Sequence, residues 1–356
     1  MVDNLFDAIV IGASAIGSRI AKLIADSGHN VLLIEEHKKI GLPSKCTGLI
    51  SHRLLQLLPN LPKKIIINKI KSARFFSPNG NCFELKSKNP VYLIDRTALD
   101  NFLFNEAKNS KVEIKTGERF ESFRQMNDCV NIKTNKKIYH SKILIGADGA
   151  NSLVRKYSKL DYPKNVLFGL QTTVKGNFDS KSVELWFGSS VAPNFFAWIV
   201  PENNHTARVG LATDSNPMRF YNSFLKNRIG HISKPDTSGI IRYGIMKETN
   251  IDRVMLVGDA ALQTKPFSGG GLIYGLTASK ICADAAIKSL EEGRFDKRFF
   301  KGNYDKKWKE KLSLPITKGM MLRKFFNLLP NNCLNFLFYS TSHAKKFLER
   351  WDMDLL

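Results

Sequence analysis

The stretch Asp7-Ala-Ile-Val-Ile-Gly12, followed at once by Ala-Ser14-Ala15-Ile-Gly17, decides the fold of this chain. A short β-branched run that stops at a glycine predicts a buried strand, and the apolar spacing over 16–27 predicts a helix. After Gly28, the run Val31-Leu-Leu-Ile-Glu35 predicts a second buried strand that is closed by an acid. The order strand, helix, strand indicates a βαβ unit and therefore an α/β fold.

The turn between the first strand and the helix has the composition of a phosphate-binding loop. Gly12, Ser14, Ala15 and Gly17 place backbone N–H groups and the positive end of a helix where a pyrophosphate can bind. Ser14 stands where a glycine is usual, but its small side chain still permits close approach of the backbone. Glu35 lies 35 − 12 = 23 residues after Gly12, where its carboxylate can accept hydrogen bonds from ribose hydroxyls. These residues predict a dinucleotide site.

The composition is that of an ordinary globular protein, since 43% of the residues are hydrophobic and 24% are charged. The 356 residues suffice for two domains or for one domain with an inserted subdomain. The five cysteines are scattered without a C-x-x-C pair, which argues against a metal site and favours a reducing compartment. We find no signal-peptide pattern and no run of about 18 apolar residues. The expected location is cytoplasmic, either free or peripheral on the inner face of the membrane.

The chain is strongly basic, with 54 Lys and Arg against 32 Asp and Glu and a net charge of +22. The lysines are spread along the chain and no nucleic-acid-binding motif accompanies them, so nucleic acid is not the expected partner. Anionic lipid surfaces or phosphorylated substrates fit this charge better. A solvated lysine-rich surface without a specific partner is the alternative.

The remaining pattern divides the chain into a discontinuous first lobe and an inserted second lobe. Beyond the βαβ unit, a helix is expected over 97–108, and short strands are expected at 65–70, 73–76, 82–85, 112–114, 130–134, 137–139 and 143–145. Longer alternating segments over 166–213 predict an antiparallel sheet, and a strand at 254–259 then leads into a helix over 272–290. We therefore predict a nucleotide-binding domain over 1–62, 91–160 and 240–294, a substrate domain over 63–90 and 161–239, and a helical region over 295–356.

Three further motifs follow the βαβ unit: Asp95-Arg96-Thr97-Ala-Leu99, Gly146-Ala-Asp148-Gly149-Ala-Asn-Ser152-Leu-Val-Arg155, and Gly258-Asp259-Ala-Ala261 with the later Gly269-Gly270-Gly271-Leu272. With them the chain resembles flavoproteins of the p-hydroxybenzoate hydroxylase-like fold. The resemblance implies a Rossmann-like FAD-binding domain of the GR2 type with an inserted antiparallel-sheet substrate lobe and a C-terminal helical tail. It places Arg96 near the flavin and Asp259 on the ribityl chain, and glycine amides at a helix start would stabilise the negative charge of FAD. The residues expected to bind FAD are Gly12, Ser14, Ala15, Gly17, Glu35, Cys46, Thr47, Arg96, Phe120, Asp148, Gly258, Asp259, Gly270, Gly271 and Leu272.

A segment of the second lobe narrows the resemblance. Pro193-Asn-Phe-Phe196-Ala-Trp198-Ile-Val200-Pro201 is similar to the signature Pro-x-x-Tyr-x-Trp-x-Phe-Pro of geranylgeranyl reductases, with Phe196 for tyrosine and Val200 for phenylalanine. These FAD enzymes, which include archaeal digeranylgeranylglycerophospholipid reductases, saturate isoprenoid double bonds. The resemblance implies that Pro193, Phe196, Trp198 and Pro201 bind the substrate in an apolar tunnel, although ordinary core packing is the alternative. Burial at roughly 0.8 kcal/mol per CH₂ would give a twenty-carbon chain on the order of 10 kcal/mol before ordering costs.

The expected chemistry also needs a proton donor. An isolated alkene accepts hydride poorly unless a positioned acid protonates one carbon as the hydride reaches the other. The resemblance places Cys46 close to the flavin, so we expect it to donate this proton or to gate the site, with Lys45 nearby to tune it. A buried structural cysteine is the alternative. The expected partners are a prenyl-lipid or prenyl-diphosphate substrate and a reduced nicotinamide or ferredoxin-type electron donor.

Two other functions and two roles for the tail stay open at this point. An FAD monooxygenase or halogenase would share the fold, but only half of the halogenase motif Trp-x-Trp-x-Ile-Pro occurs at Phe196–Pro201. A non-catalytic or electron-carrying flavoprotein at a membrane surface is the other candidate, although no cysteine set for an iron–sulfur cluster accompanies it. In the tail, apolar stretches at 320–329 and 334–338 are flanked by basic residues, which is typical either of an interfacial helix pair or of packing against the sheet.

Overall fold

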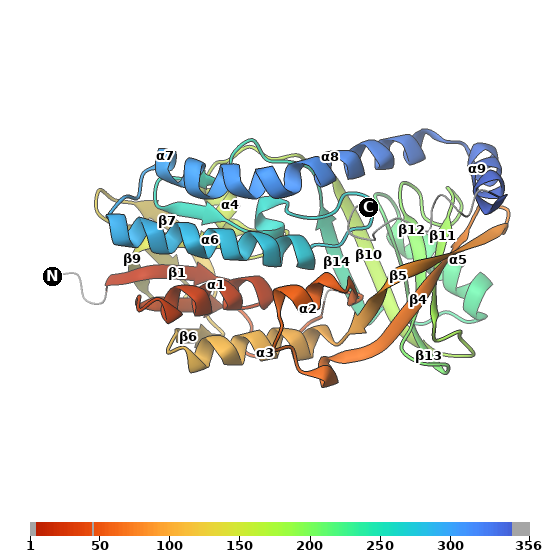
Figure 1. The fold of residues 1–356 in the computed structure, drawn as a ribbon, viewed down its shortest axis with the longest axis horizontal. Helices are drawn as coiled ribbons and strands as arrows, with labels where there is room; N and C mark the ends of the chain where they lie inside the picture. Colours follow the sequence, from red (N-terminus) through yellow and green to blue (C-terminus); the bar gives the residue numbers. More distant parts are fainter. Residues whose placement is uncertain (1–4, 45, 344–356) are drawn as a thin grey trace.

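The computed structural model describes residues 5–44 and 46–343. It is an elongated molecule in which a layered α/β half and a half built on a second sheet lie end to end (Figure 1). Helix α8 (Lys306–Leu328) runs along one side and connects the two halves.

The sheet of the first half is parallel at its centre. Its order is β15 (Asn250–Ile251), β16 (Val254–Leu256), β9 (Ile138–Gly146), β1 (Leu5–Ile11), β2 (Val31–Glu35) and β6 (Glu113–Thr116). β1 pairs in parallel with both β2 and β9, so that Val10 lies between Leu33 and Ile145. A ribbon of β7 (Phe120–Gln125) and β8 (Val130–Thr134) extends β9 in antiparallel pairing. The strands buried on both faces read as continuous β-branched runs, as parallel strands require.

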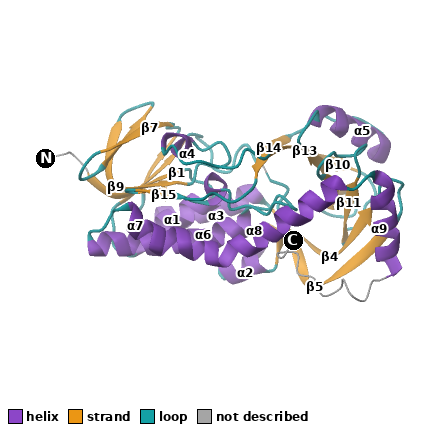
Figure 2. Ribbon diagram, turned by 90° about the horizontal axis from the view of Figure 1, so that it is seen from above, coloured by secondary structure: helices purple, strands orange, loops and turns teal. Residues whose placement is uncertain are grey.

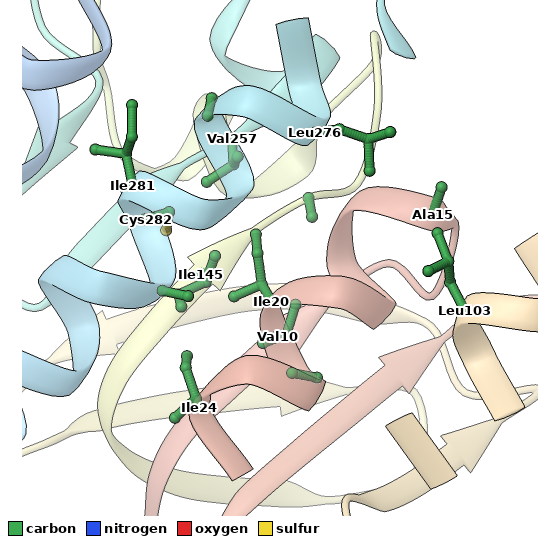
Figure 3. Close-up of a cluster of buried hydrophobic side chains, with 14 of the residues drawn as sticks. Val10, Ala15, Ile20, Ile24, Leu103, Ile145, Val257, Leu276, Ile281 and Cys282 are labelled. Carbon is green, nitrogen blue, oxygen red and sulfur yellow. The ribbon is translucent and has the colours of Figure 1, made fainter. Parts of the chain in front are cut away.

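Three helices cover one face of this sheet: α1 (Ala15–Asp26), α3 (Arg96–Asn109) and α6 (Leu272–Glu292). Ile20 and Ile24 of α1 and Leu276 and Ile281 of α6 belong to one buried cluster above Val10 (Figure 3). Because both helices begin at the carboxyl edge of the sheet, their N-termini point to the same place. A second apolar cluster on the opposite face lies among the β7–β8 ribbon, α4 (Leu153–Tyr157) and the 3₁₀ turn η2 (Gly258–Ala261).

The second sheet has the order β14 (Thr237–Arg242), β10 (Val166–Lys175), β13 (Thr206–Thr213), β12 (Phe196–Pro201), β11 (Ser182–Phe187), β4 (Ile66–Phe76), β5 (Cys82–Ile94) and β3 (Leu49–Ser51). Its pairs are antiparallel except for β4 and β11, which run parallel. Helix α5 (Pro217–Ile229), which the sequence reading left out, packs on β13 and β10. Two short helices, α2 (Arg53–Leu57) and η1 (Lys63–Ile65), lie between β3 and β4.

Several expected strands were too short. The two strands expected at 65–70 and 73–76 form the single β4, which carries a bulge near Ile70, and β5 extends nine residues beyond the expected 82–85. Two predicted domain limits therefore cut strands: 90/91 falls inside β5 and 239/240 falls inside β14. β3 also pairs into the second sheet although the range 1–62 was assigned to the first domain. Because β5 and β14 continue through the predicted limits, the sequence has no composition break at these positions.

The tail is helical where it is described. It contains α7 (Lys297–Phe300), a π-helical turn η3 (Lys301–Asp305), α8 and α9 (Asn331–His343). Tyr304 and Trp308 are fully buried against the first half, whereas α9 reaches the second sheet, as the view from above also shows (Figure 2). No helix among the described residues has the length and apolarity needed to span a membrane.

Candidate functional site

The glycine turn before α1 is shaped by the backbone. Gly12 has φ +99°, and a Cβ there would lie 2.5 Å from the carbonyl oxygen of Ala147. A Cβ at Gly17 would lie 1.8 Å from the carbonyl oxygen of Gly12. Ser14 is the N-cap of α1 and its side chain makes no capping hydrogen bond, while Ala15 begins the helix. The turn thus presents a helix N-terminus with unhindered backbone, as an anionic pyrophosphate requires.

Glu35 ends β2 beside this turn. One carboxylate oxygen accepts a hydrogen bond from the backbone N–H of Ala13 at 2.8 Å, and the other accepts from the N–H of His37 at 3.0 Å. The ring Nδ1 of His37 lies 2.6 Å from the same second oxygen. These bonds fix the carboxylate at the carboxyl edge of the sheet. Its contact with a ribose stays a prediction.

Asp100, which the sequence reading missed, joins the turn to α3. Its Oδ1 accepts a hydrogen bond from the N–H of Ala15 at 3.0 Å and one from the guanidinium of Arg96 at 3.2 Å. Burial opposes the charge of Arg96, but the Asp100 carboxylate and the Cys46 thiol outweigh it and raise the pKa of Arg96 above its ordinary value. The only sequence signal for Asp100 is its spacing of four residues from Arg96 on one helix.

Cys46 lies half-buried on the loop that follows β2. Its Sγ accepts a hydrogen bond from the N–H of Gly48 at 3.4 Å and lies close enough to Arg96 to favour the charge of that side chain. Lys45, the residue expected to tune Cys46, lies outside the described residues. Among the described residues, Arg96 places a positive charge beside this thiol. The ion pair with Asp100 fixes the position of Arg96.

Thr47 connects the Cys46 loop to the second sheet. The side-chain oxygen of Gln171 accepts hydrogen bonds from the Thr47 hydroxyl at 2.7 Å and from the indole N–H of Trp198 at 3.0 Å. Arg208 donates to the carbonyl oxygen of Thr47 at 2.5 Å and is paired with Glu202 at 2.8 Å. Trp198 therefore faces the Cys46 loop through one polar side chain. Neither Gln171 nor Arg208 was expected as a site residue, because no spacing pattern marks either side chain within its strand.

The loop around Asp259 forms the other wall of the site. A Cβ at Gly271 would lie 2.6 Å from Oδ1 of Asp259, so only glycine leaves this carboxylate in place. In the described part of the chain, the Asp259 carboxylate has no hydrogen-bond or ion-pair partner of its own. Burial raises the pKa of Asp259, although the charges of Arg96 and Arg155 oppose this. An acceptor held without a partner beside a glycine start of α6 fits a ribityl hydroxyl of FAD.

Other members of this loop are held by the backbone and the tail. Gly258 has φ +67° and donates its N–H to the side chain of Gln263 at 2.7 Å, and Gln263 in turn bonds the hydroxyl of Tyr304 at 3.0 Å. The carbonyl of Gly270 accepts from the N–H of Lys265 at 3.0 Å, which closes the turn before Leu272 starts α6. The tail therefore supports the loop from behind.

Two expected cofactor residues serve the fold in this structure. Asp148 accepts hydrogen bonds from the Ser152 hydroxyl at 2.5 Å and from the N–H of Val154 at 3.1 Å, and burial raises its pKa. It thereby organises the start of α4. Phe120 is buried in the cluster on the opposite face of the sheet, edge-on to Tyr157. Any contact of either residue with FAD stays a prediction.

A pocket of about 150 Å³, partly open to solvent, lies between the second sheet and the tail. Its wall is largely aromatic and apolar and is formed by Phe187, Phe196, Phe267, Phe326, Leu329 and Leu334, among others. Pro193 lines it as well, whereas Pro201 lies at the far end of β12, where its carbonyl accepts from Asn68 at 2.9 Å. Trp198 contacts the pocket residue Phe196 edge-on, with ring centroids 6.3 Å apart.

Arg323 of α8 is the charged residue of this pocket. It is 4% exposed, donates to the carbonyl of Pro266 at 2.8 Å and also to the carbonyl of Asn194. Its guanidinium lies over the rings of Phe195 and Tyr243, and its Nε has no hydrogen-bond partner in the described structure. Burial lowers the pKa of Arg323. One side chain thus connects the tail, the loop after Asp259 and the loop before β12.

The arrangement can hold an extended dinucleotide along the carboxyl edge of the first sheet and bring an apolar molecule to it from the second. Within 5–44 and 46–343, no group of His, Cys, Asp and Glu could hold a metal ion. The polar groups described between the two sheets include the Cys46 thiol, the Arg96 guanidinium, the Gln171 amide and the Trp198 indole N–H. They can orient a ligand and move a proton, and they leave oxidation and reduction to the dinucleotide.

Comparisons with known proteins agree with this geometry. Residues 6–277 match the family model described as an FAD binding domain. A digeranylgeranylglycerophospholipid reductase of Methanosarcina acetivorans is 28% identical, with 96% of this chain and 90% of that protein covered. An uncharacterized protein of Methanocaldococcus jannaschii is 31% identical over 93% of this chain and 87% of its own length. The crystal structure of a geranylgeranyl bacteriochlorophyll reductase-like protein from Thermoplasma acidophilum superposes with a TM-score of 0.91 at 22% identity, covering 99% of this chain and 94% of that one.

Proposed function

This chain belongs to the FAD binding domain family, and from that premise we propose that it saturates carbon–carbon double bonds of geranylgeranyl chains in lipid precursors or membrane lipids. Its cofactor is FAD and it is an FAD-dependent oxidoreductase. The names of several relatives support the choice of substrate, because they are digeranylgeranylglycerophospholipid reductases at 26–28% identity.

One observation carries the proposal: an aromatic pocket and a thiol loop meet the flavin-binding loop from the side of the second sheet. Phe267, which follows the Asp259 loop, lines the same pocket as Phe196 of β12. Thr47, beside Cys46, is joined through Gln171 to Trp198. An apolar chain that enters the pocket would therefore need few polar contacts, since burial of its methylene groups supplies the affinity.

The side chains around the site have separate roles in the proposed reaction. FAD, when bound and reduced, supplies the hydride, and an external donor of the reduced nicotinamide or ferredoxin type restores it. Cys46 Sγ–H delivers a proton to the alkene carbon that does not receive the hydride. Arg96 lies beside this sulfur, so its positive charge faces the thiolate that would remain. Asp100 neutralises Arg96 and fixes it to the N-terminus of α1, while the aromatic wall excludes water.

The test is reduction of a geranylgeranyl lipid by chemically reduced protein under anaerobic conditions, followed by mass spectrometry of the lipid. We expect a gain of two hydrogens for each double bond that reacts. The Cys46→Ser variant should retain its flavin, because Cys46 lies on a loop at the edge of the site, and should lose roughly 100-fold in rate, as is typical when a positioned acid is removed. A wild-type protein that holds FAD but leaves every prenyl lipid unchanged would refute the proposed function.

The rival function is an FAD monooxygenase or halogenase, and one residue weighs against a halogenase. Phe196 stands at the first tryptophan of the motif Trp-x-Trp-x-Ile-Pro and packs within the aromatic cluster, stacked on Phe195 at 4.1 Å. Consumption of oxygen coupled to reduced nicotinamide, with a small aromatic substrate, would favour this rival. The apolar pocket favours a prenyl chain over a small aromatic substrate. We also propose that the protein is located peripherally on an anionic membrane surface.

A further inference from the structure

Helix α8 has two faces of opposite character. Its inner face is buried and is formed by Trp308, Leu312, Ile316, Gly319 and Arg323. Its outer face exposes Leu314, Met321, Phe325 and Leu328 to 62%, 67%, 51% and 72%. At 3.6 residues per turn these four lie within one narrow stripe opposite the inner face. Large apolar side chains gathered on one exposed stripe need a partner.

The same face is basic. Lys311, Lys318 and Lys324 are exposed beside the stripe, and none of them forms an ion pair within the described structure. Over residues 306–343, Glu310 is the single acid in the sequence. A second copy of this chain would bring an equally basic face against it, which like-charge repulsion disfavours. An anionic lipid surface offers both the apolar layer and the opposite charge.

The stripe leads directly to the pocket. Asn327, Leu329, Pro330 and Asn331, at the elbow between α8 and α9, line the pocket, and Leu328 lies exposed between them. On α9, Phe336 is 72% exposed next to this elbow. Figure 1 shows α8 along one side of the molecule with the elbow at its end, beside the second sheet.

We propose that the outer face of α8 and the α8–α9 elbow rest on an anionic bilayer, and that the prenyl chain passes from the bilayer into the pocket at the elbow. The passage of the chain rests on the proposed function, whereas the docking itself does not. Lys311, Lys318 and Lys324 contact headgroups, and Met321, Phe325, Leu328 and Phe336 enter the acyl boundary.

The experiment is flotation of the full chain, loaded with FAD, on vesicles of phosphatidylglycerol and phosphatidylcholine. The variant Met321→Ser, Phe325→Ser, Leu328→Ser should bind about tenfold or more weakly, because it removes apolar area that would enter the bilayer. A matched control, Met126→Ser with Ile138→Ser, removes apolar side chains that are 47% and 57% exposed on β7–β9 at the other end of the molecule, and should float as the wild type does. All substituted side chains are exposed, so folding and flavin content should be unchanged.

Charge is tested separately. Lys311→Glu, Lys318→Glu, Lys324→Glu should abolish the preference for phosphatidylglycerol over phosphatidylcholine, and added salt should weaken wild-type binding as it shortens the Debye length to about 3 Å at 1 M. Binding that is equal on neutral vesicles, or equal in the serine variant and its control, overturns the proposal. A wild-type dimer that the serine variant converts to monomer, without vesicle binding by either, assigns the face to a second copy instead.

Activity measurements in detergent and in vesicles distinguish a failure of this inference from a failure of the proposed function. The serine variant should reduce a prenyl lipid in detergent at the wild-type rate and lose activity only when the lipid is in vesicles. Vesicle binding without reduction of any prenyl lipid would refute the function and leave the docking intact. Reduction that is equally fast in vesicles for both proteins would refute the entry route.

Discussion

The glycine turn before α1 and the pocket at the α8–α9 elbow are the two ends of the proposed site, and their residue types are determined in different ways. At Gly17 the residue type is dictated by the backbone, since a Cβ would overlap the carbonyl of Gly12. At the pocket, the residue types are dictated by side chains that arrive from β11, β12, the Phe267 loop and the tail. The first kind of site leaves a local motif in the sequence, and the second leaves scattered aromatic residues.

The largest effect is expected where the backbone sets the residue. Gly271→Ala places a Cβ 2.6 Å from Oδ1 of Asp259, so this carboxylate must move. We expect FAD affinity to fall roughly 100-fold, the upper range for overpacking of a tight site. Gly302→Ala is the control, because a Cβ there meets nothing within 4 Å. Flavin retained after gel filtration measures the effect, and equal retention by the two variants would contradict this account of the Asp259 loop.

A smaller effect is expected at Asp259 itself, with opposite signs for affinity and stability. Asp259→Asn should weaken FAD binding roughly tenfold, since a charged acceptor is lost. The apo variant should nevertheless melt at a higher temperature at neutral pH. Burial raises the folded pKa above its ordinary 3.8, so the wild-type carboxylate favours folding at low pH and loses that contribution as the pH rises through the folded pKa.

The pH dependence of the Asp259 prediction is checked by thermal melts of both apo proteins. The advantage of the variant should shrink as the pH falls and vanish below about 4, where the wild-type group becomes protonated in the unfolded state as well. An advantage that stays constant with pH would show that the substitution acts through packing and not through charge.

The smallest effect is expected in the connection between the two halves. Gln171→Leu leaves the Thr47 hydroxyl and the Trp198 indole without their shared acceptor, which should raise KM for a prenyl lipid about fivefold at unchanged flavin content. Gln125→Leu is the matched control, because this exposed glutamine at the end of β7 bonds the carbonyl of Asp252 in the first half. A change in flavin affinity in place of KM would assign Gln171 to the cofactor side of the site.

The sequence predicted the parts of the molecule in which backbone geometry restricts the choice of residue. The βαβ unit, the Asp259 loop and the return of the chain to the first sheet follow from glycines placed after β-branched runs. β5 was underestimated because charged and polar residues fill its solvent-exposed middle, which masks the strand pattern. α5 was missed because its buried face has only three large residues.

Within the site, residues whose partners lie far away in the sequence were missed. Asp100 reaches across from α3 to Ala15, and Arg323 reaches from the tail to Pro266, so neither contact has a local signature. Asp148 was assigned to the cofactor by its motif, which stays a prediction, and its hydrogen bonds within the chain organise the start of α4. The same residues can be required by the conformation of a turn as well as by a ligand.

Arg323 has a consequence for how this protein can be shortened. Because its guanidinium connects the carbonyls of Pro266 and Asn194 between two aromatic rings, a chain cut anywhere before it would release two loops at once. The tail is thus part of the structure that forms the site. Deleting it would disturb catalysis as well as lipid contact, so a truncation cannot separate the two. Point substitutions on the outer surface of the same helix leave that anchor intact.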